Sequence, residues 1–83
     1  MENRYATNER VEISPRFRRT IEERIERLER NAAFDEARVS ALQHPDHVRR
    51  QLRLVAVERA EALRMRLFLD RAGTRFPRPM IAL

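Results

Sequence analysis

Apolar residues recur through residues 46–72 at spacings that predict one long helix. This stretch contains no Gly or Pro and is rich in Leu, Ala, Arg and Glu, which all favour helix. Asp46 is suited to cap the start, and Gly73 is suited to a left-handed residue just past the end. At about 1.5 Å per residue, the helix would be roughly 40 Å long.

This helix carries apolar residues on three ridges. The first ridge is Leu52, Ala56, Leu63 and Leu67; the second ridge is Leu54, Val57, Met65, Phe68 and Ala72; the third ridge is Val48, Val55, Ala62 and Leu69. Its one clearly charged sector is a narrow arginine ridge of Arg49, Arg53, Arg64 and Arg71. A helix that is apolar on most of its circumference is buried on most of it. The rest of the chain is barely large enough to cover it, so we expect a homodimer or a complex with another protein.

A one-sided amphipathic helix is predicted to begin at Ser14-Pro15. Ser is a preferred N-cap, and Pro suits the first helical position. The apolar residues that follow share one narrow face: Phe17, Ile21, Ile25, Leu28 and Ala32. Almost every other position from 16 to 30 is Arg or Glu, which indicates a solvated face. Before this helix, residues 9–13 alternate polar and apolar side chains and predict a short strand or extended arm.

The end of this helix has two interpretations. If the helix continues past Asn31, it places Asp35 in the apolar seam, and an unpaired buried carboxylate is costly. We favour a break near Asn31, after which Asp35 caps a short helix from Glu36 to Gln43. The continuous alternative gives a helix nearly as long as residues 46–72, and therefore an antiparallel helical hairpin.

Length and composition limit the class of protein. The 83 residues form one small, mainly α-helical domain near the size at which a single core is marginally stable. The chain has no Cys, which excludes disulfides and thiolate metal sites. No stretch approaches the ~20 apolar residues of a membrane span, and residues 1–12 lack the apolar core of a signal peptide. We therefore expect a cytoplasmic protein.

Positive charge allows several kinds of partner. The chain has 18 basic residues, all of them Arg, and a net charge of +5. DNA, RNA, an acidic protein or an anionic surface would each be attracted to it. The candidate nucleic-acid contacts are Arg10, Arg16, Arg18, Arg19 and the arginine ridge of Arg49, Arg53, Arg64 and Arg71.

The sequence contains no pattern that predicts an enzyme, a cofactor site or a metal site. A single Gly is too few for a phosphate-binding loop, and no pair of carboxylates stands out as acid and base. His44 and His47 flank Pro45 and Asp46, and Pro45 argues against the continuous helix that would put both imidazoles on one face. We interpret residues 44–47 as a capping turn.

Residues 74–83 form an apolar tail in which Pro77 and Pro79 favour an extended path. Its large apolar residues are Phe76, Met80, Ile81 and Leu83. They could pack on the chain's own core or on another chain. We favour a partner or the second subunit, because the tail starts where the long helix ends.

The spacing of residues 9–43 resembles the ribbon-helix-helix fold of small bacterial repressors and antitoxins. The residues that carry the resemblance are Val11 and Ile13, then Ser14-Pro15, then Phe17, Ile21 and Ile25, then Asn31, Phe34 and Asp35, and finally Val39 and Leu42. The resemblance implies that two chains pair their strands into a ribbon that binds DNA and interlock their helices into a shared core. It also implies a C-terminal half that wraps a protein partner, such as a toxin.

Two other functions fit the same sequence. A helical hairpin that dimerises into a four-helix bundle could serve as an adaptor or as a structural subunit of a larger assembly, without sequence-specific DNA binding. Alternatively, the arginine ridge could bind the backbone of DNA or RNA irrespective of sequence, with the salt sensitivity that phosphate contacts bring.

Overall fold

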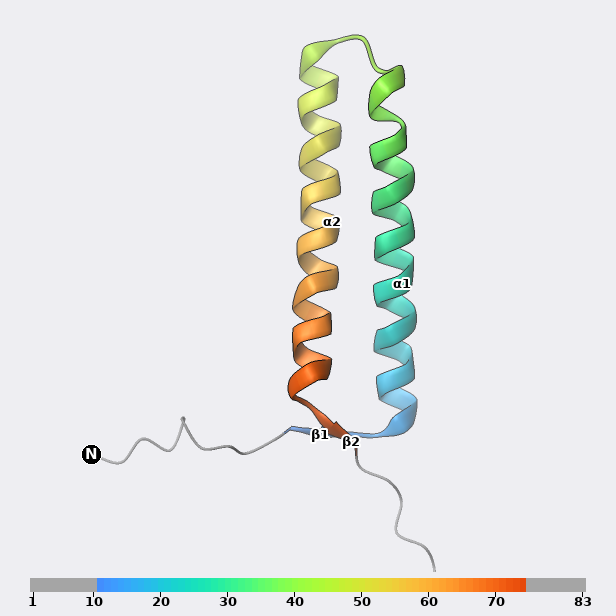
Figure 1. Cartoon of the computed structure of the whole chain (residues 1–83), viewed down its shortest axis with the longest axis vertical. Coiled ribbons are helices and arrows are strands. Elements are labelled where there is room, and N and C mark those ends of the chain that lie inside the picture. The colour runs from blue at the N-terminus through green and yellow to red at the C-terminus, as the bar shows by residue number, and fades with distance from the viewer. Residues whose placement is uncertain (1–10, 75–83) are drawn as a thin grey trace, which may run out of the picture.

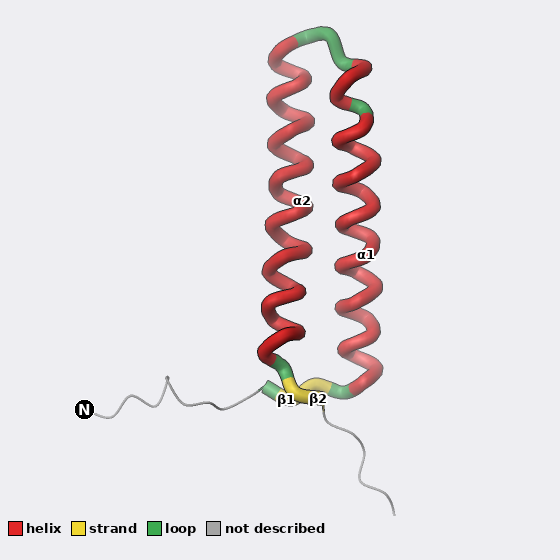
Figure 2. Tube along the Cα trace, in the orientation of Figure 1, coloured by secondary structure: helices red, strands yellow, loops and turns green. Residues whose placement is uncertain are grey.

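A computed structural model describes residues 11–74 and shows a helical hairpin (Figure 1). Helix α1 (Pro15–Ala37) and helix α2 (Pro45–Arg71) run antiparallel and are connected through one turn of 3-10 helix, η2 (Val39–Ala41). Strands β1 (Glu12–Ile13) and β2 (Gly73–Thr74) lie together at the other end (Figure 2). The prediction of a mainly helical chain with a short N-terminal strand is confirmed.

Helix α1 begins where the sequence predicts but does not break. The Ser14 hydroxyl accepts a hydrogen bond from the Phe17 amide at 3.0 Å, and Pro15 is the first helical residue. The predicted break near Asn31 and the short helix 36–43 are wrong, because α1 continues to Ala37. Ala32 is completely buried in the middle of the expected break. Packing along this part of α1 therefore outweighs the tendency of Asp35 to cap a new helix.

Helix α2 begins one residue earlier than predicted, with a different cap. His44 Nδ1 accepts a hydrogen bond from the Asp46 amide at 3.1 Å, so His44 is the N-cap and Asp46 lies in the first turn. Pro45 is the first residue of the helix, because its fixed φ angle suits that position. The predicted Asp46 cap is therefore wrong, although the acidic side chain still lies at the favourable end of the helix dipole.

At the C-terminal end of α2, strand pairing takes the place of a glycine cap. No described glycine has a positive φ, so the predicted left-handed conformation of Gly73 is wrong. Gly73 instead extends into β2, and its amide donates a hydrogen bond to the Val11 carbonyl at 2.9 Å. Strands β1 and β2 pair in parallel, with Glu12 opposite Gly73 and Ile13 opposite Thr74. This pairing ties the two ends of the hairpin together.

The core is the single interface between the two helices and the strands beneath them. Its buried cluster consists of Ile13, Ile25, Ala62 and Leu69, with Ile21, Leu28, Met65 and Ala72 packed around it. Val55, Ala62 and Leu69 of the third ridge are all buried, so this ridge faces α1. In the part of the chain that the structure describes, neither helix combines the length and the apolar character needed to cross a membrane.

Candidate protein-interaction surface

Helix α1 covers the third apolar ridge of α2 and leaves most of the first and second ridges exposed. Six large apolar side chains of the first and second ridges remain between 36% and 56% exposed: Leu52, Leu54, Val57, Leu63, Leu67 and Phe68. Isolated exposed apolar residues are ordinary, but rows of them on one element mark an interaction surface. Phe17 of α1 is also about half exposed.

The second ridge and the N-terminal part of α1 form one side of the hairpin, which we call the seam face. Phe17 and Ile21 line a surface hollow of about 420 Å³ together with Met65 and Phe68 of the second ridge. Leu54 and Val57 continue the same row by helical spacing. The seam face therefore combines apolar side chains from both helices.

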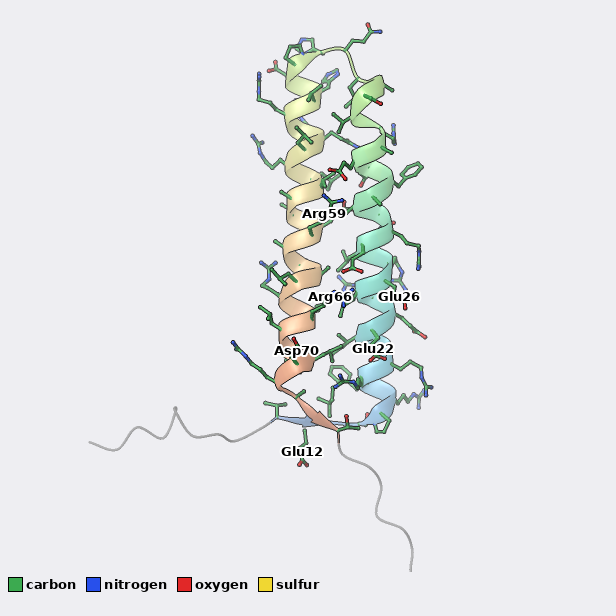
Figure 3. All side chains as sticks on the ribbon, viewed as in Figure 1. Glu12, Glu22, Glu26, Arg59, Arg66 and Asp70 are labelled. Atoms are coloured by element: carbon green, nitrogen blue, oxygen red, sulfur yellow. The ribbon has the colours of Figure 1, made fainter. Side chains whose placement is uncertain are left out.

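Two ion pairs connect the helices on the other side of the hairpin, which we call the ion-pair face. Arg59 donates two hydrogen bonds to the Glu36 carboxylate at 2.7 and 3.3 Å. Arg66, which is labelled on α2 in Figure 3, likewise contacts both carboxylate oxygens of Glu29 at 2.8 Å. These hydrogen bonds lower the pKa of Glu29 and of Glu36. Leu63 of the first ridge lines a shallow hollow with Glu29, Arg59 and Arg66, so the first ridge borders this face.

An acidic pair lies between the helices on the seam face. Asp35 and Glu58 are both half-buried. Their interaction shifts the pKa of Glu58 in the same direction as burial does. Burial, a hydrogen bond with Asp35 and the Asp35 charge together raise the pKa of Glu58. The Oε1 atom of Glu58 is buried without a hydrogen-bond partner.

The sequence prediction placed Asp35 at a cap and did not place Glu58 beside it. The structure places Asp35 in the helix interface, where Gln51 Nε2 donates to its backbone carbonyl at 2.8 Å. Glu58 lies three residues after Val55 and four residues before Ala62. This helical spacing places Glu58 beside the third ridge, and it is the sequence signal that could have located Glu58 at the helix interface. Both residues are only half-buried, so the cost is smaller than for a fully buried carboxylate, although burial still raises the pKa of Glu58.

The arginines proposed as nucleic-acid contacts do not form one patch. Arg53, Arg64 and Arg71 are exposed on α2, and Arg64 also borders the hollow that Phe17 and Ile21 of α1 line. Arg16 is exposed half a turn around α1 from the buried Ile25, on the opposite edge of the hairpin, and Arg19 is exposed on α1 as well.

Two of the predicted arginines already have partners. Arg49 forms an ion pair with Asp46 in the first turn of α2. Arg18 contacts Glu22 at 3.4 Å and donates to the Leu69 carbonyl at 3.4 Å, so its guanidinium is directed toward the helix interface. The remaining predicted site residues lie outside the described residues: Arg10 and the tail residues Phe76, Met80, Ile81 and Leu83.

No protein-family model matches the chain, and neither a curated protein nor a solved structure is detectably similar to it. The class that the fold defines is a two-helix hairpin with exposed apolar ridges. Function is therefore inferred from these ridges and from the charges around them.

Proposed function

We propose that this protein is a small homodimeric helical-hairpin module that acts as an adaptor or structural subunit by binding other proteins. The observation that carries the proposal is that six large side chains of the first and second ridges stay exposed, whereas α1 covers the third ridge. Burying such a side chain completely is worth about 1.5–3 kcal/mol, so several in one interface can drive association.

The two exposed ridges have different neighbours, and this difference supports different partners for them. The second ridge belongs to the seam face, where Phe17 and Ile21 of α1 widen the apolar surface. A second copy on this face would complete a four-helix bundle, which is the usual way for two hairpins to bury such surfaces. The first ridge adjoins charged ion pairs and offers a narrower strip, which remains open to another protein in the dimer.

Two neighbouring leucines on α2 separate these roles in an experiment. Leu54 on the second ridge is 44% exposed and Leu52 on the first ridge is 45% exposed, so they form a matched pair. We expect the wild-type protein and Leu52→Glu to sediment as dimers at about micromolar concentration, and Leu54→Glu to sediment as a monomer. Circular dichroism should show equal helix content in all three. A helical wild-type monomer at about a hundred times that concentration contradicts the proposal.

Binding of nucleic acid is the second candidate function. Its support is that Arg53, Arg64 and Arg71 are exposed and form no ion pair with any residue among 11–74. Such a ridge would bind the phosphate backbone, with affinity that falls as salt rises. The ribbon-helix-helix repressor or antitoxin stays a prediction; in the described residues, β1 pairs with β2 of its own chain.

Gel shifts at low salt distinguish these nucleic-acid functions. For backbone binding through the arginine ridge, Arg53→Ala with Arg64→Ala should weaken binding to every sequence, and Arg10→Ala should have no effect. For a DNA-reading ribbon, Arg10→Ala should weaken binding to a specific site more than to random DNA. Absence of any shift with either DNA or RNA contradicts both.

A further inference from the structure

The seam face has two halves that differ in charge. The lower half, near the strands, holds the apolar hollow lined by Phe17 and Phe68, and the charged residues that also line this hollow are Arg24, Arg64 and Glu61. The upper half, toward η2, holds Asp35 and Glu58: Asp35 follows Leu28 by about two helical turns, and Glu58 precedes Met65 by the same spacing. One half therefore offers a cation beside apolar side chains, and the other offers two carboxyl groups.

The acidic pair has no cationic partner within the described chain. The arginine ion pairs among residues 11–74 go to other carboxylates, and none reaches Asp35 or Glu58. Arg24 contacts Glu61 at 3.7 Å, which is a long and partly exposed ion pair. Its guanidinium can therefore take a second carboxylate partner from a neighbouring molecule.

Helical geometry places Arg24 and Asp35 where a symmetric dimer could use both. They are eleven residues apart, which is about three turns or roughly 16 Å, so both lie on the same side of α1. A two-fold axis that crosses α1 midway between them, near Leu28, would lay two α1 helices antiparallel to each other. Each Arg24 would then face Asp35 of the other copy, and the symmetry would make this contact twice.

Two copies could also pack seam face to seam face about a two-fold axis that runs parallel to the helices. That arrangement would place α1 of one copy over α2 of the other at the same height. Asp35 and Glu58 of both copies would then meet, and four carboxyl groups would share one apolar interface. Like charges that meet in an interface repel each other, so the charge pattern disfavours this orientation.

We propose that a second copy binds the seam face in the reverse direction, so that the lower half of each copy packs on the upper half of the other. Arg24 of each copy then pairs with Asp35 of the other. This inference rests on the proposed dimer and adds its orientation and the residues that select it. Glu61 lies near the two-fold axis and stays paired with Arg24 of its own chain, so each guanidinium links two carboxylates across the interface. The lower apolar half of each copy covers Asp35 and Glu58 of the other.

Cysteine cross-linking tests the orientation directly, because the chain contains no Cys. Thr20 and Arg38 are exposed and lie eighteen residues apart, about five turns, so they share one side of α1 at equal distances from the proposed axis. A mixture of Thr20→Cys and Arg38→Cys proteins should give a mixed covalent dimer with a short bis-maleimide. Neither protein alone should cross-link. Glu23→Cys, on the outer side of α1, is the matched control and should not cross-link to Arg38→Cys.

Charge reversal tests the residues that select the orientation. Arg24→Glu should weaken dimerisation by about tenfold or more, and the double variant Arg24→Glu with Asp35→Arg should restore it, because both copies then carry the exchanged pair. A wild-type dimer that gives no mixed cross-link overturns this orientation and leaves the proposed function intact. The same holds if the double variant dimerises more weakly than Arg24→Glu. A wild-type monomer in sedimentation would instead overturn the proposed function itself.

Discussion

Asp35 of α1 and Glu58 of α2 place two carboxyl groups beside each other across the helix interface, and this proximity helps to raise the pKa of Glu58. Two like charges at short distance cannot both ionise without cost, so one carboxyl group retains its proton to a higher pH than usual. The burial of Glu58 acts in the same direction and is the larger cause of its raised pKa. The helix interface is therefore sensitive to pH at this acidic pair.

Hairpin stability should pass through a maximum in mildly acidic solution. Glu58 has a raised pKa in the folded chain, so its contribution is complete below its ordinary value of 4.5 and is lost as the pH rises through the raised value. Glu29 and Glu36 have lowered pKa values, so their contributions are complete above 4.5 and are lost as the pH falls. Thermal unfolding of dilute protein at a series of pH values measures both slopes.

The variant Glu58→Gln tests whether Glu58 causes the loss of stability as the pH rises. The neutral amide keeps the shape of the side chain and can donate a hydrogen bond to Asp35 at any pH. At neutral pH we expect a gain of about 0.5–1.5 kcal/mol in the free energy of unfolding, the usual net value of a hydrogen bond. The loss of stability between mildly acidic and neutral pH should disappear. An unchanged pH profile would mean that another group causes this loss.

Two adjacent alanines on α1 test how closely the helices pack. Ala32 is completely buried against α2, whereas Ala33 is exposed. Ala32→Leu should destabilise the hairpin by about 1–3 kcal/mol, because extra methylene groups must force the helices apart. Ala33→Leu should be nearly neutral in urea unfolding. Equal effects of the two substitutions would contradict the described interface.

The Ser14 cap tests the start of α1. Ser14→Ala removes the acceptor for the Phe17 amide and should cost about 1 kcal/mol of stability. Ser14→Asp should retain most of it, because a carboxylate can accept the same hydrogen bond and suits the N-terminal end of the helix dipole. Thermal unfolding of the three proteins gives the comparison. A drop for Ser14→Asp as large as that for Ser14→Ala would indicate that the hydroxyl does not act as a cap.

The pair of Arg66 and Glu29 should couple the helices weakly and in a salt-dependent way. Its geometry is bidentate at 2.8 Å, but both side chains are roughly half exposed to solvent, so screening limits its value. A double-mutant cycle with Arg66→Ala and Glu29→Ala should show favourable coupling at low salt that largely vanishes at high salt. Coupling that persists at high salt would show that packing of the arginine stem, and not charge, connects the two residues.

The sequence was sufficient where the signals are local. Ser14-Pro15 located the start of α1, and the absence of Gly and Pro in residues 46–72 located most of α2. The hydrophobic spacing also separated the three apolar ridges of α2, since this depends only on the number of residues per turn. Even the continuous α1 and the resulting hairpin were recognised as an alternative, although we favoured the break.

The tertiary structure decided what depends on a neighbour distant in the chain. Periodicity shows that α2 has three apolar ridges, but only the position of α1 determines that the third is covered and the other two are open. Gly73 looked like a helix cap, yet its amide pairs with Val11, sixty-two positions earlier in the sequence. The sequence also predicted a cap at Asp35, because the residues around Asp35 do not indicate that Glu58 of α2 lies beside it. Local propensities differ by about 1 kcal/mol, so contacts between α1, α2 and the strands were enough to override them.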